Sequence, residues 1–550
     1  TQTGENLTYK IIYSLISNQL SGAAYPAIGT TYYQAVHPLE KAMSRYSMAY
    51  NRISIDWGAD RGYRILVSDS AGNGRFILQD FSISAKLVNY FKYDKRNRLI
   101  ESGYVEISDS VTWDNLLAFA NNMEYPRNDS AGITVHQMLV TYEYDMEGYG
   151  YSLGRLCRTI TYSAYSCIEY FYDQLGRLSK QTLQDGSVIT QEFVRDNLYN
   201  LLRIKYVRAN MSDYFLDYKY VDNEVKQIDM NQGSSKKTIF SLGEYDIYKR
   251  LTNYTDCNGY SISYRYDLFG RQIELGGQKA ATSVSVAKKY TESSLADQRL
   301  EELKYEPEKI TKVFHYDEFM RLKSVSGSET DMNYDKNGNL TSFAKGSTQM
   351  TLQYEGVNKL KNASGTIFDY DGAGNVVKVS HGTDYIYQFA PDRMYPSKIA
   401  ALMITSGGYP VGSRSIYYDG FGRVVHLVQG IANSPVFVYA HSYFDDGRIL
   451  QIEVTSGSTK TYESYVYVGN RLIAQQNGDN TWNGLCYDDN KTLYIVTSAS
   501  NIESVKYNAW GLPAQASGAT FVYKDMQLLT DINLYFYEGC FYDPSFGVTY

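Results

Sequence analysis

The sequence predicts an all-β protein built from repeated hairpins, and three observations carry that prediction. Tyrosine, a residue that favours strands, makes up 56 of the 550 residues. One phrase, Tyr-Asp-x-x-Gly-Arg-aliphatic, returns many times along the chain. The residues before it alternate between apolar and polar, as in Ser261–Asp267, which is the period of a strand.

The repeated phrase sets the organisation of the chain. Clear copies begin at Tyr93, Tyr172, Tyr245, Tyr266, Tyr316, Tyr334, Tyr370 and Tyr418, and weaker ones at Tyr144, Tyr354, Tyr443 and Tyr467. Adjacent copies lie 16 to 28 residues apart, which accommodates two strands and their connections. Because a single hairpin is not stable alone, consecutive hairpins are expected to pair into one long sheet. A twisted sheet of that many strands must curl or close.

Each residue of the phrase has an expected structural role. The tyrosine ends a strand, and the aspartate starts a turn by accepting a hydrogen bond from backbone two residues on. The glycine takes a positive φ, and arginine then leads into the next strand. The residues assigned to this structural repeat are Tyr93, Asp94, Tyr172, Asp173, Gly176, Arg177, Tyr266, Asp267, Gly270, Arg271, Tyr316, Asp317, Tyr334, Asp335, Gly338, Tyr370, Asp371, Gly374, Tyr418, Asp419, Gly422 and Arg423.

A few short helices are predicted where the phrase is missing. Ser285–Tyr305 is the strongest candidate, since it is rich in Ala, Leu, Glu and Lys. Thr112–Met123 could form a second helix. A third is confined to the second half of Tyr32–Arg52, because Pro38 interrupts the first half.

Charge and hydropathy exclude some classes of function. The formal net charge of −7, without a long basic run, argues against nucleic-acid binding. No stretch approaches 18 consecutive apolar residues, so no membrane span is predicted, and no signal peptide is visible. The five cysteines are scattered; a Cys157–Cys167 bridge is possible, but reduced, buried thiols are the favoured interpretation.

No catalytic, metal or cofactor site is predicted. Asp335–Asn339 opens like a calcium loop, but the sixth and twelfth positions are Leu340 and Gly346, so an aspartate-assisted turn is expected. Asp371–Asn375 lacks a following helix that could hold a phosphate. His315 and His426 are expected to be strand side chains, because no histidine pair has metal-binding spacing.

The phrase resembles the YD repeat of the Rhs family, which includes bacterial polymorphic toxins, C components of insecticidal toxin complexes and the animal teneurins. The resemblance runs from about Tyr93 to Tyr550. Near the end, Leu534–Tyr550 resembles a degenerate Rhs-associated core, in which Tyr542, Asp543, Pro544 and Gly547 match the motif Y-D-P-x-x-G. The usual Arg-Phe after that motif is Val548–Thr549 here, and the D-H-L-G-S element is replaced by Thr497–Asn501.

This resemblance implies a spiralling sheet closed into a hollow shell, or cocoon. Residues 91–460 would form the wall, 461–550 a C-terminal cap, and 1–90 a plug or docking region. The shell would enclose a C-terminal toxin or other cargo polypeptide and work with a secretion machine or toxin-complex subunit, outside the producing cell. Autoproteolysis is not carried over, because this chain lacks the family's D-P-x-G motifs.

Two other classes of function remain open. A cell-surface adhesion or carbohydrate-binding protein would use exposed aromatic residues on the outside of the sheet. An enzyme, either self-cleaving or glycan-degrading, would need a carboxylate pair that the many acidic residues could hide. The sequence selects no such pair, so no enzyme activity is predicted.

Overall fold

In the computed structural model, every regular element of the described residues is a β-strand. The structure describes residues 11–13, 20–24 and 53–58, most of 62–107 and 133–507, and the short segments 513–516, 535–537, 540–543 and 548–549. The prediction of an all-β fold made of successive hairpins is therefore confirmed.

The first sheet contains 23 of the described strands. They are β1 (Ile11–Tyr13), β2 (Leu20–Ala24), β3 (Ile53–Gly58), β4 (Gly62–Ser68), β5 (Gly74–Gln79), β6 (Lys86–Tyr93), β7 (Leu99–Ile107), β8 (Ile133–Tyr144), β9 (Leu156–Thr161), β10 (Ser166–Tyr172), β11 (Leu178–Gln184), β12 (Val188–Arg195), β13 (Leu201–Val207), β14 (Tyr214–Val221), β15 (Glu224–Gln232), β16 (Ser235–Tyr245), β17 (Leu251–Asp256), β18 (Ser261–Tyr266), β19 (Gln272–Lys279), β20 (Thr282–Tyr290), β21 (Leu300–Glu306), β22 (Ile310–Tyr316) and β23 (Leu322–Val325).

The second sheet contains the remaining 21 described strands. They are β24 (Glu329–Tyr334), β25 (Leu340–Lys345), β26 (Thr348–Glu355), β27 (Lys359–Ala363), β28 (Thr366–Tyr370), β29 (Val376–His381), β30 (Tyr385–Pro391), β31 (Ile399–Ser406), β32 (Tyr409–Tyr418), β33 (Val424–Ile431), β34 (Phe437–Tyr443), β35 (Ile449–Ser456), β36 (Thr459–Val468), β37 (Arg471–Gln476), β38 (Trp482–Asp488), β39 (Lys491–Ser498), β40 (Asn501–Tyr507), β41 (Pro513–Ala516), β42 (Tyr535–Tyr537), β43 (Cys540–Asp543) and β44 (Val548–Thr549).

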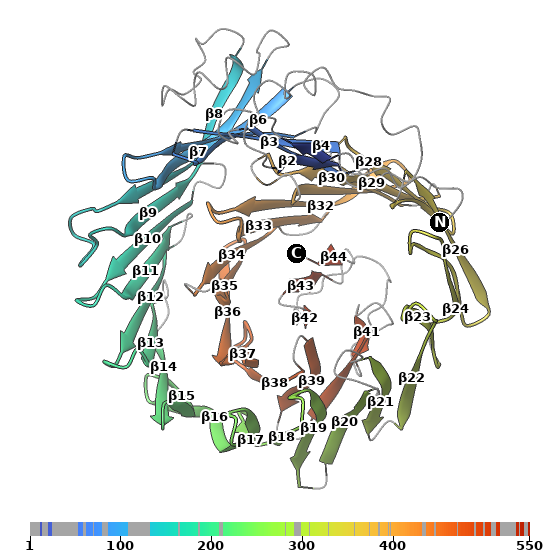
Figure 1. The fold of residues 1–550 in the computed structure, drawn as a ribbon. Helices are drawn as coiled ribbons and strands as arrows, with labels where there is room; N and C mark the ends of the chain where they lie inside the picture. The colour runs from blue at the N-terminus through green and yellow to red at the C-terminus, as the bar shows by residue number, and fades with distance from the viewer. Residues whose placement is uncertain are drawn as a thin grey trace. The chain divides into compact units, whose positions relative to one another are not determined.

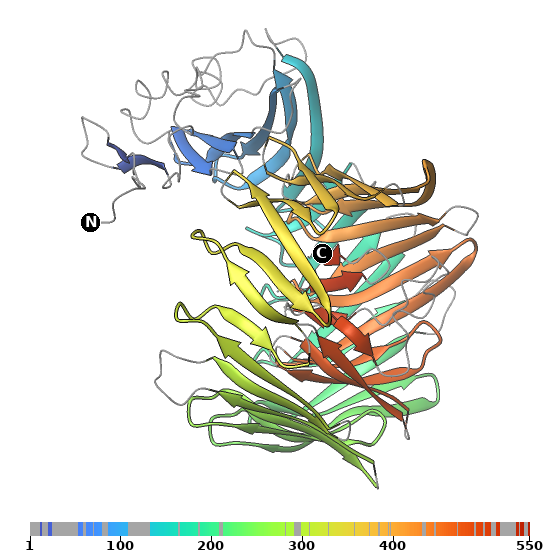
Figure 2. The ribbon, with the colours of Figure 1, turned by 90° about the vertical axis from the view of Figure 1, so that its right-hand side faces the viewer.

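Pairing between strands that follow each other in the chain builds both sheets. Antiparallel ladders join β12 to β13, β13 to β14, β14 to β15 and so on through β19. These strands lie side by side in Figure 1, and the green strands of the run are seen again in Figure 2. Two described pairs depart from this pattern, because β2 and β3 are parallel and β39 also pairs with β42. The contacts of the fold are therefore mostly local in sequence.

Two compact units can be distinguished by their internal contacts. The first comprises residues 1–170, 335–339 and 351–434, and the second comprises 171–334, 340–350 and 435–550. The division at residues 90 and 460 made from the sequence remains a prediction.

In the second unit, the early strands pack face to face against later ones. The strands β11–β19 present buried side chains to β34–β38, which run beside them in Figure 1. The Gln191 amide donates to Ser442 Oγ at 2.9 Å, and the Tyr254 hydroxyl donates to the Leu485 carbonyl at 3.3 Å. Buried polar groups need such partners, so these bonds fix how the two layers match.

The first unit has a similar long-range contact. The Tyr142 hydroxyl donates to the carbonyl of Gly420 at 2.7 Å. A Cβ at Gly420 would lie 2.4 Å from that hydroxyl oxygen, so the approach requires glycine. The Asn89 amide similarly donates to the Arg393 carbonyl at 2.7 Å.

The helix predicted for Ser285–Tyr305 is wrong. Residues at its two ends form β20 and β21, which pair antiparallel with Val286 opposite Tyr305. In β20, Val284 and Val286 are buried, whereas Ser283 is exposed. Buried and exposed side chains therefore alternate, as they do along a strand. Pairing with neighbouring strands outweighs the modest helix propensity of Ala, Lys and Glu. The other two helix predictions, at Thr112–Met123 and within Tyr32–Arg52, fall outside the described residues.

The strand assignment at β20 can be tested by mutation. Val286→Ala is expected to lower the free energy of unfolding by about 1–3 kcal/mol, because a buried side chain is truncated. Ser283→Ala, on the opposite face, should change it by less than about 0.5 kcal/mol. Chemical denaturation measures both values, and equal effects at the two positions would contradict the strand.

Candidate functional site in the repeated turns

The aspartate of each repeat closes the same turn. In the copy at Tyr172, the Asp173 amide donates to the Arg177 carbonyl at 2.9 Å, and the Gly176 amide donates to the Asp173 carbonyl at 2.8 Å. Asp173 Oδ1 also accepts the amides of Leu175 and Arg177, each at 2.9 Å. These backbone bonds recur at Asp94, Asp246, Asp267, Asp317, Asp335, Asp371 and Asp419. The predicted role of the aspartate is confirmed.

The third residue after the aspartate has a positive φ in each of these turns. The glycines have φ values between 71° and 86°, at Gly176, Gly270, Gly338, Gly374 and Gly422. Where glycine is missing, Asn97, Lys249 and Met320 adopt φ values of 59°, 59° and 66°. The backbone therefore keeps one turn shape, and non-glycine copies accept the steric strain.

The arginine turns back onto its own aspartate. Arg177 Nε lies 2.6 Å from Asp173 Oδ2, and the matching distance is 2.5 Å for Arg271 and Asp267. Partial burial acts to raise the pKa of Asp267, but hydrogen bonds from Arg271 outweigh it, and the pKa is lowered. At Asp335 the same place is taken by Asn339, whose amide donates to Oδ2 at 2.9 Å.

The tyrosine binds the turn of the copy before it. The Tyr266 hydroxyl donates to the Leu251 carbonyl at 3.0 Å, and the Arg250 guanidinium lies 4.5 Å from the centre of the Tyr266 ring. The same guanidinium also lies 5.0 Å from the ring of Tyr248, in its own turn. Arg250 is thus held between two aromatic rings, as are Arg271 and Arg321, and a cation is favoured over an aromatic face.

This contact, which we call the tyrosine clasp, recurs along the chain. In the clasp, the hydroxyl of a repeat tyrosine donates a hydrogen bond to the backbone carbonyl of the residue that follows the arginine of the preceding turn. The tyrosine ring lies against the side chain of that arginine, or of the residue that replaces it. The hydroxyl–carbonyl pairs are Tyr316–Leu300, Tyr334–Leu322, Tyr370–Leu360 and Tyr418–Ile399, at 2.5 to 2.9 Å. Tyr93 and Tyr172 hold the same final position of their strands, β6 and β10.

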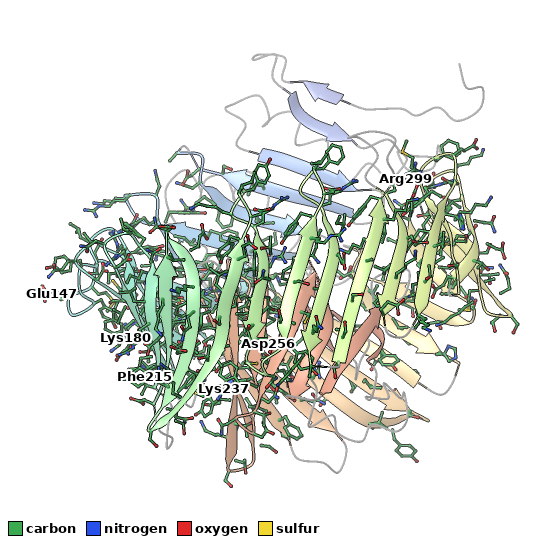
Figure 3. The ribbon with its side chains drawn as sticks, turned by 90° about the horizontal axis from the view of Figure 1, so that it is seen from below. Glu147, Lys180, Phe215, Lys237, Asp256 and Arg299 are labelled. Atoms are coloured by element: carbon green, nitrogen blue, oxygen red, sulfur yellow. The ribbon has the colours of Figure 1, made fainter. Side chains whose placement is uncertain are left out.

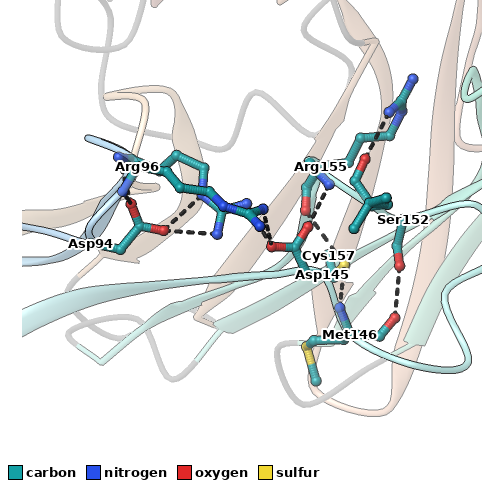
Figure 4. A network of polar contacts seen from close by, with 10 residues as sticks. Asp94, Arg96, Asp145, Met146, Ser152, Arg155 and Cys157 are labelled. Atoms are coloured by element: carbon teal, nitrogen blue, oxygen red, sulfur yellow. Dashed lines mark hydrogen bonds and ion pairs between the residues drawn. The ribbon is translucent and has the colours of Figure 1, made fainter.

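Ion pairs also link the turn of Asp94 to the turn of Asp145 (Figure 4). Arg98 contacts both its own Asp94 and Asp145 of the next copy, each at 2.7 Å. Its guanidinium lies 4.5 Å from the ring centre of Tyr144. One arginine therefore joins two turns through charge and stacking at once.

Several turns of this kind were not anticipated. Asp69, Asp196 and Asp256 form the same aspartate-assisted turn. None is preceded by tyrosine, so a search anchored on Tyr-Asp misses them. A search for Asp-x-x-Gly would have found the turns of Asp69 and Asp256, but not that of Asp196, where Tyr199 holds the glycine position. Arg299 also fills an arginine position, 5.0 Å from the Tyr316 ring.

Asp256 differs from turn aspartates such as Asp267 and Asp335 because neither an arginine nor an asparagine donates to its Oδ2. The arginine position is occupied by Tyr260, and Asp256 is buried with Oδ2 lacking a hydrogen-bond partner. It faces the later layer, where a Cβ on Gly484 would lie 2.1 Å from Oδ2. Burial raises the pKa of this carboxyl despite hydrogen bonds from the turn amides. Figure 3 labels Asp256, the last residue of β17, and Arg299, which lies directly before β21.

The alternative chemistries find no support in the described part of the chain. Both Asp335 oxygens are occupied by groups of its own turn, and the described residues contain no cluster of three potential metal ligands. His315 and His426 lie in β22 and β33, as predicted. Cys157 and Cys167 are free thiols.

Two further sequence predictions concern the membrane and the C-terminal motif. Among the described residues, no helix has the length and hydropathy needed to cross a membrane. Tyr542 and Asp543 belong to β43, whereas Pro544 and Gly547 fall outside the described residues. The assignment of the C-terminal core therefore stays a prediction.

Comparison with known proteins agrees with this architecture. The geometry defines a repeat protein whose units are hairpins joined by aspartate turns. A sequence model of the family described as RHS Repeat matches residues 245–276. The fold of the chain is similar to crystal structures of TcdB2-TccC3-TEV and TcdB2-TccC3-Cdc42, with TM-scores of 0.69 and 0.70 and 12% identity. The chain therefore contains a segment that matches the RHS repeat, and its fold is similar to that of the TcdB2-TccC3 structures.

The extent of these matches is uneven. Each covers 98% of this chain but only 28% of the matched chain. The structure of TcdB2-TccC3 without the hypervariable C-terminal region matches similarly, with a TM-score of 0.69 and 11% identity. No curated protein sequence matches the chain.

The role of glycine in the turn can be tested at Gly176. Gly176→Val should lower the free energy of unfolding by at least about 1–2 kcal/mol, because valine disfavours a φ of 71°. Gly176→Asn is the matched control and should cost less, since Asn97 occupies the equivalent position. Denaturation followed by circular dichroism measures both free energies of unfolding. The interpretation would be contradicted if both variants were as stable as the parent protein.

The unpaired carboxylate predicts an unusual pH dependence. The pKa of Asp256 is higher in the folded protein than in the unfolded chain, where it is about 3.9. The stabilising contribution of this carboxyl is therefore fully present below that unfolded pKa, and it is lost as the pH rises through the folded pKa. Asp256→Asn should therefore stabilise the protein at pH 7 by about 1 kcal/mol or more. That gain should vanish near pH 3.

A matched control is Asp267→Asn, which removes a carboxylate that Arg271 does pair. This variant should destabilise the protein at pH 7, since the folded pKa of Asp267 is lowered. Urea denaturation at the two pH values measures both effects. A loss of stability at pH 7 in both variants would show that Asp256 is not a costly charge.

Proposed function

We propose that this chain forms part of a β-shell that encloses, and helps to deliver, a toxin or other cargo polypeptide. The observation that carries the proposal is the similarity of fold to TcdB2-TccC3 over 98% of the chain. Those structures belong to a longer protein, of which this chain spans about 28%. The proposed shell would therefore include other parts besides the described sheet.

The chemistry of the repeats fits a structural role. The turn aspartates accept hydrogen bonds from their own backbone, their arginines pair with them, and the tyrosine hydroxyls donate to neighbouring carbonyls. Side chains engaged in this way build a wall and are not available as nucleophiles or general bases. A protein that isolates a polypeptide needs a continuous barrier, and antiparallel pairing of successive hairpins provides one. We accordingly propose no enzyme activity for this chain.

The partners follow from the same proposal. The enclosed partner would be a cargo polypeptide, and a subunit of a toxin complex would assist its delivery outside the producing cell. The fold similarity to TcdB2-TccC3 supports such a partner.

Carbohydrate binding is a second candidate, and exposed rings favour it. Tyr248, Phe269 and Phe319 follow the aspartates of three turns and are largely exposed, with one face covered by the arginine of the turn. An aromatic face left open to solvent can stack on a sugar ring. Binding on a glycan array that is lost in the triple alanine variant would favour this function over enclosure.

Enclosure predicts protection from proteases. An unstructured reporter peptide placed after Tyr550 should be digested at least tenfold more slowly than the same peptide placed before Thr1. Urea at a concentration that unfolds the sheet should remove the difference. Gel analysis of a digestion time course measures this, and equal digestion at the two ends in native buffer would reject enclosure of a C-terminal segment.

A further inference from the structure

Large apolar side chains gather at one edge of the sheet in the second unit. They follow the turn aspartates by one or two positions, in the turns that lead into β11, β13, β17, β19 and β23. We call this row the apolar rim, and its main members are Leu175, Leu198, Ile247, Leu268, Phe269 and Phe319. Ile247 and Leu268 are 90% and 101% exposed, so they contribute almost nothing to the packing of the fold.

The opposite edge of the same strands has a different character. Its described turns, such as those around Gly233, Asn258 and Lys279, contain no exposed large hydrophobic side chain. Turn geometry alone therefore does not explain the rim, because both edges consist of turns between the same strands. On the same edge, the polar β14–β15 turn at Asp222 and Asn223 separates Leu198 from Ile247, so the rim consists of two apolar clusters. Exposed apolar clusters of this size mark interaction surfaces.

The size of the rim is appropriate for a protein interface. Six side chains that each expose on the order of 100 Å² give roughly 600 Å² of apolar surface, at or beyond the largest patch of a typical monomer. A standard interface buries about 800 Å² per partner. Four of the six residues are aliphatic, which suits a protein surface better than a sugar.

The spacing and charge of the rim identify the kind of partner. Turns on one edge recur every second strand, so their tips are about 9–10 Å apart. The rim of a second, identical chain has the same spacing between its turn tips. Four of the five rim turns pair their aspartate with their arginine, as in Asp246–Arg250 and Asp267–Arg271, so two rims would meet with little net repulsion.

We propose that the apolar rim is a self-association surface on which the rim of a second copy of this chain docks. The two rims would run antiparallel about a twofold axis, so that each copy offers the same surface to the other. Ile247 and Leu268, which project furthest, would occupy spaces between the turn tips of the partner. The proposal does not depend on enclosure of a cargo.

Sedimentation velocity over a range of protein concentrations tests this. The parent chain should show a concentration-dependent dimer. The double variant Ile247→Asp/Leu268→Asp should weaken the dissociation constant at least tenfold, because four carboxylates would meet at the rim. Thermal unfolding should be nearly unchanged, since both residues are exposed. Tyr409→Asp, at a largely exposed aromatic site in the β31–β32 hairpin of the other unit, is the control and should dimerise like the parent.

A cross-linking variant adds an independent measurement. Leu268→Cys should form an intermolecular disulfide on mild oxidation at concentrations where the parent protein dimerises, and Tyr409→Cys should not. The proposal is overturned if the parent chain is monomeric at every concentration, or if the double variant dimerises as the parent does. A monomer whose rim variants lose binding to a glycan array would assign the rim to carbohydrate instead.

Discussion

The structure depends on the arginine that leaves each turn. Its guanidinium bonds the aspartate that opened the turn and lies against the tyrosine that closes the following hairpin, as Arg271 does with Asp267 and Tyr290. One side chain therefore fixes the local turn and joins it to the next. A planar cation is suited to this double task, because it can donate in its plane while an aromatic ring covers its face. The flat, fork-shaped group explains why arginine recurs there more often than lysine.

Where this arginine is replaced, the surroundings change in a way that follows from its chemistry. Asn339 and Asn375 keep the hydrogen bond to the aspartate, and these turns stay near the surface. At Asp256 the replacement is Tyr260, which leaves a buried carboxylate oxygen with no donor. The later layer packs closely over that position, through Gly484 and the bond from Asn258 to the Trp482 carbonyl. Close packing between the layers is thus obtained at the expense of one unfavourable charge.

The sequence was sufficient for features that depend on neighbouring residues. The turn of Asp173 and Gly176, and the strand that ends at Tyr172, follow from side-chain chemistry within one copy. The partner of each tyrosine could not be read in this way, because it lies in the preceding copy at a variable distance. The helix expected for Ser285–Tyr305 failed for a related reason. Its composition favours a helix, but Val284 and Val286 are buried in a sheet, where β20 pairs with the adjacent strands β19 and β21, and composition alone does not show that pairing.

The distance between an arginine and the tyrosine ring of the next repeat is the same at two joints that are separated by different lengths of chain. The guanidinium of Arg321 lies 4.5 Å from the ring of Tyr334, in the very next hairpin, and Arg98 lies 4.5 Å from Tyr144, across a much longer excursion. The joint therefore places no constraint on what is inserted between one contact and the next. Strands can lengthen, and whole loops can be gained or lost, while adjacent turns stay in register. A lineage carrying such a sheet could remodel its surface loops extensively without redesigning the wall that carries them.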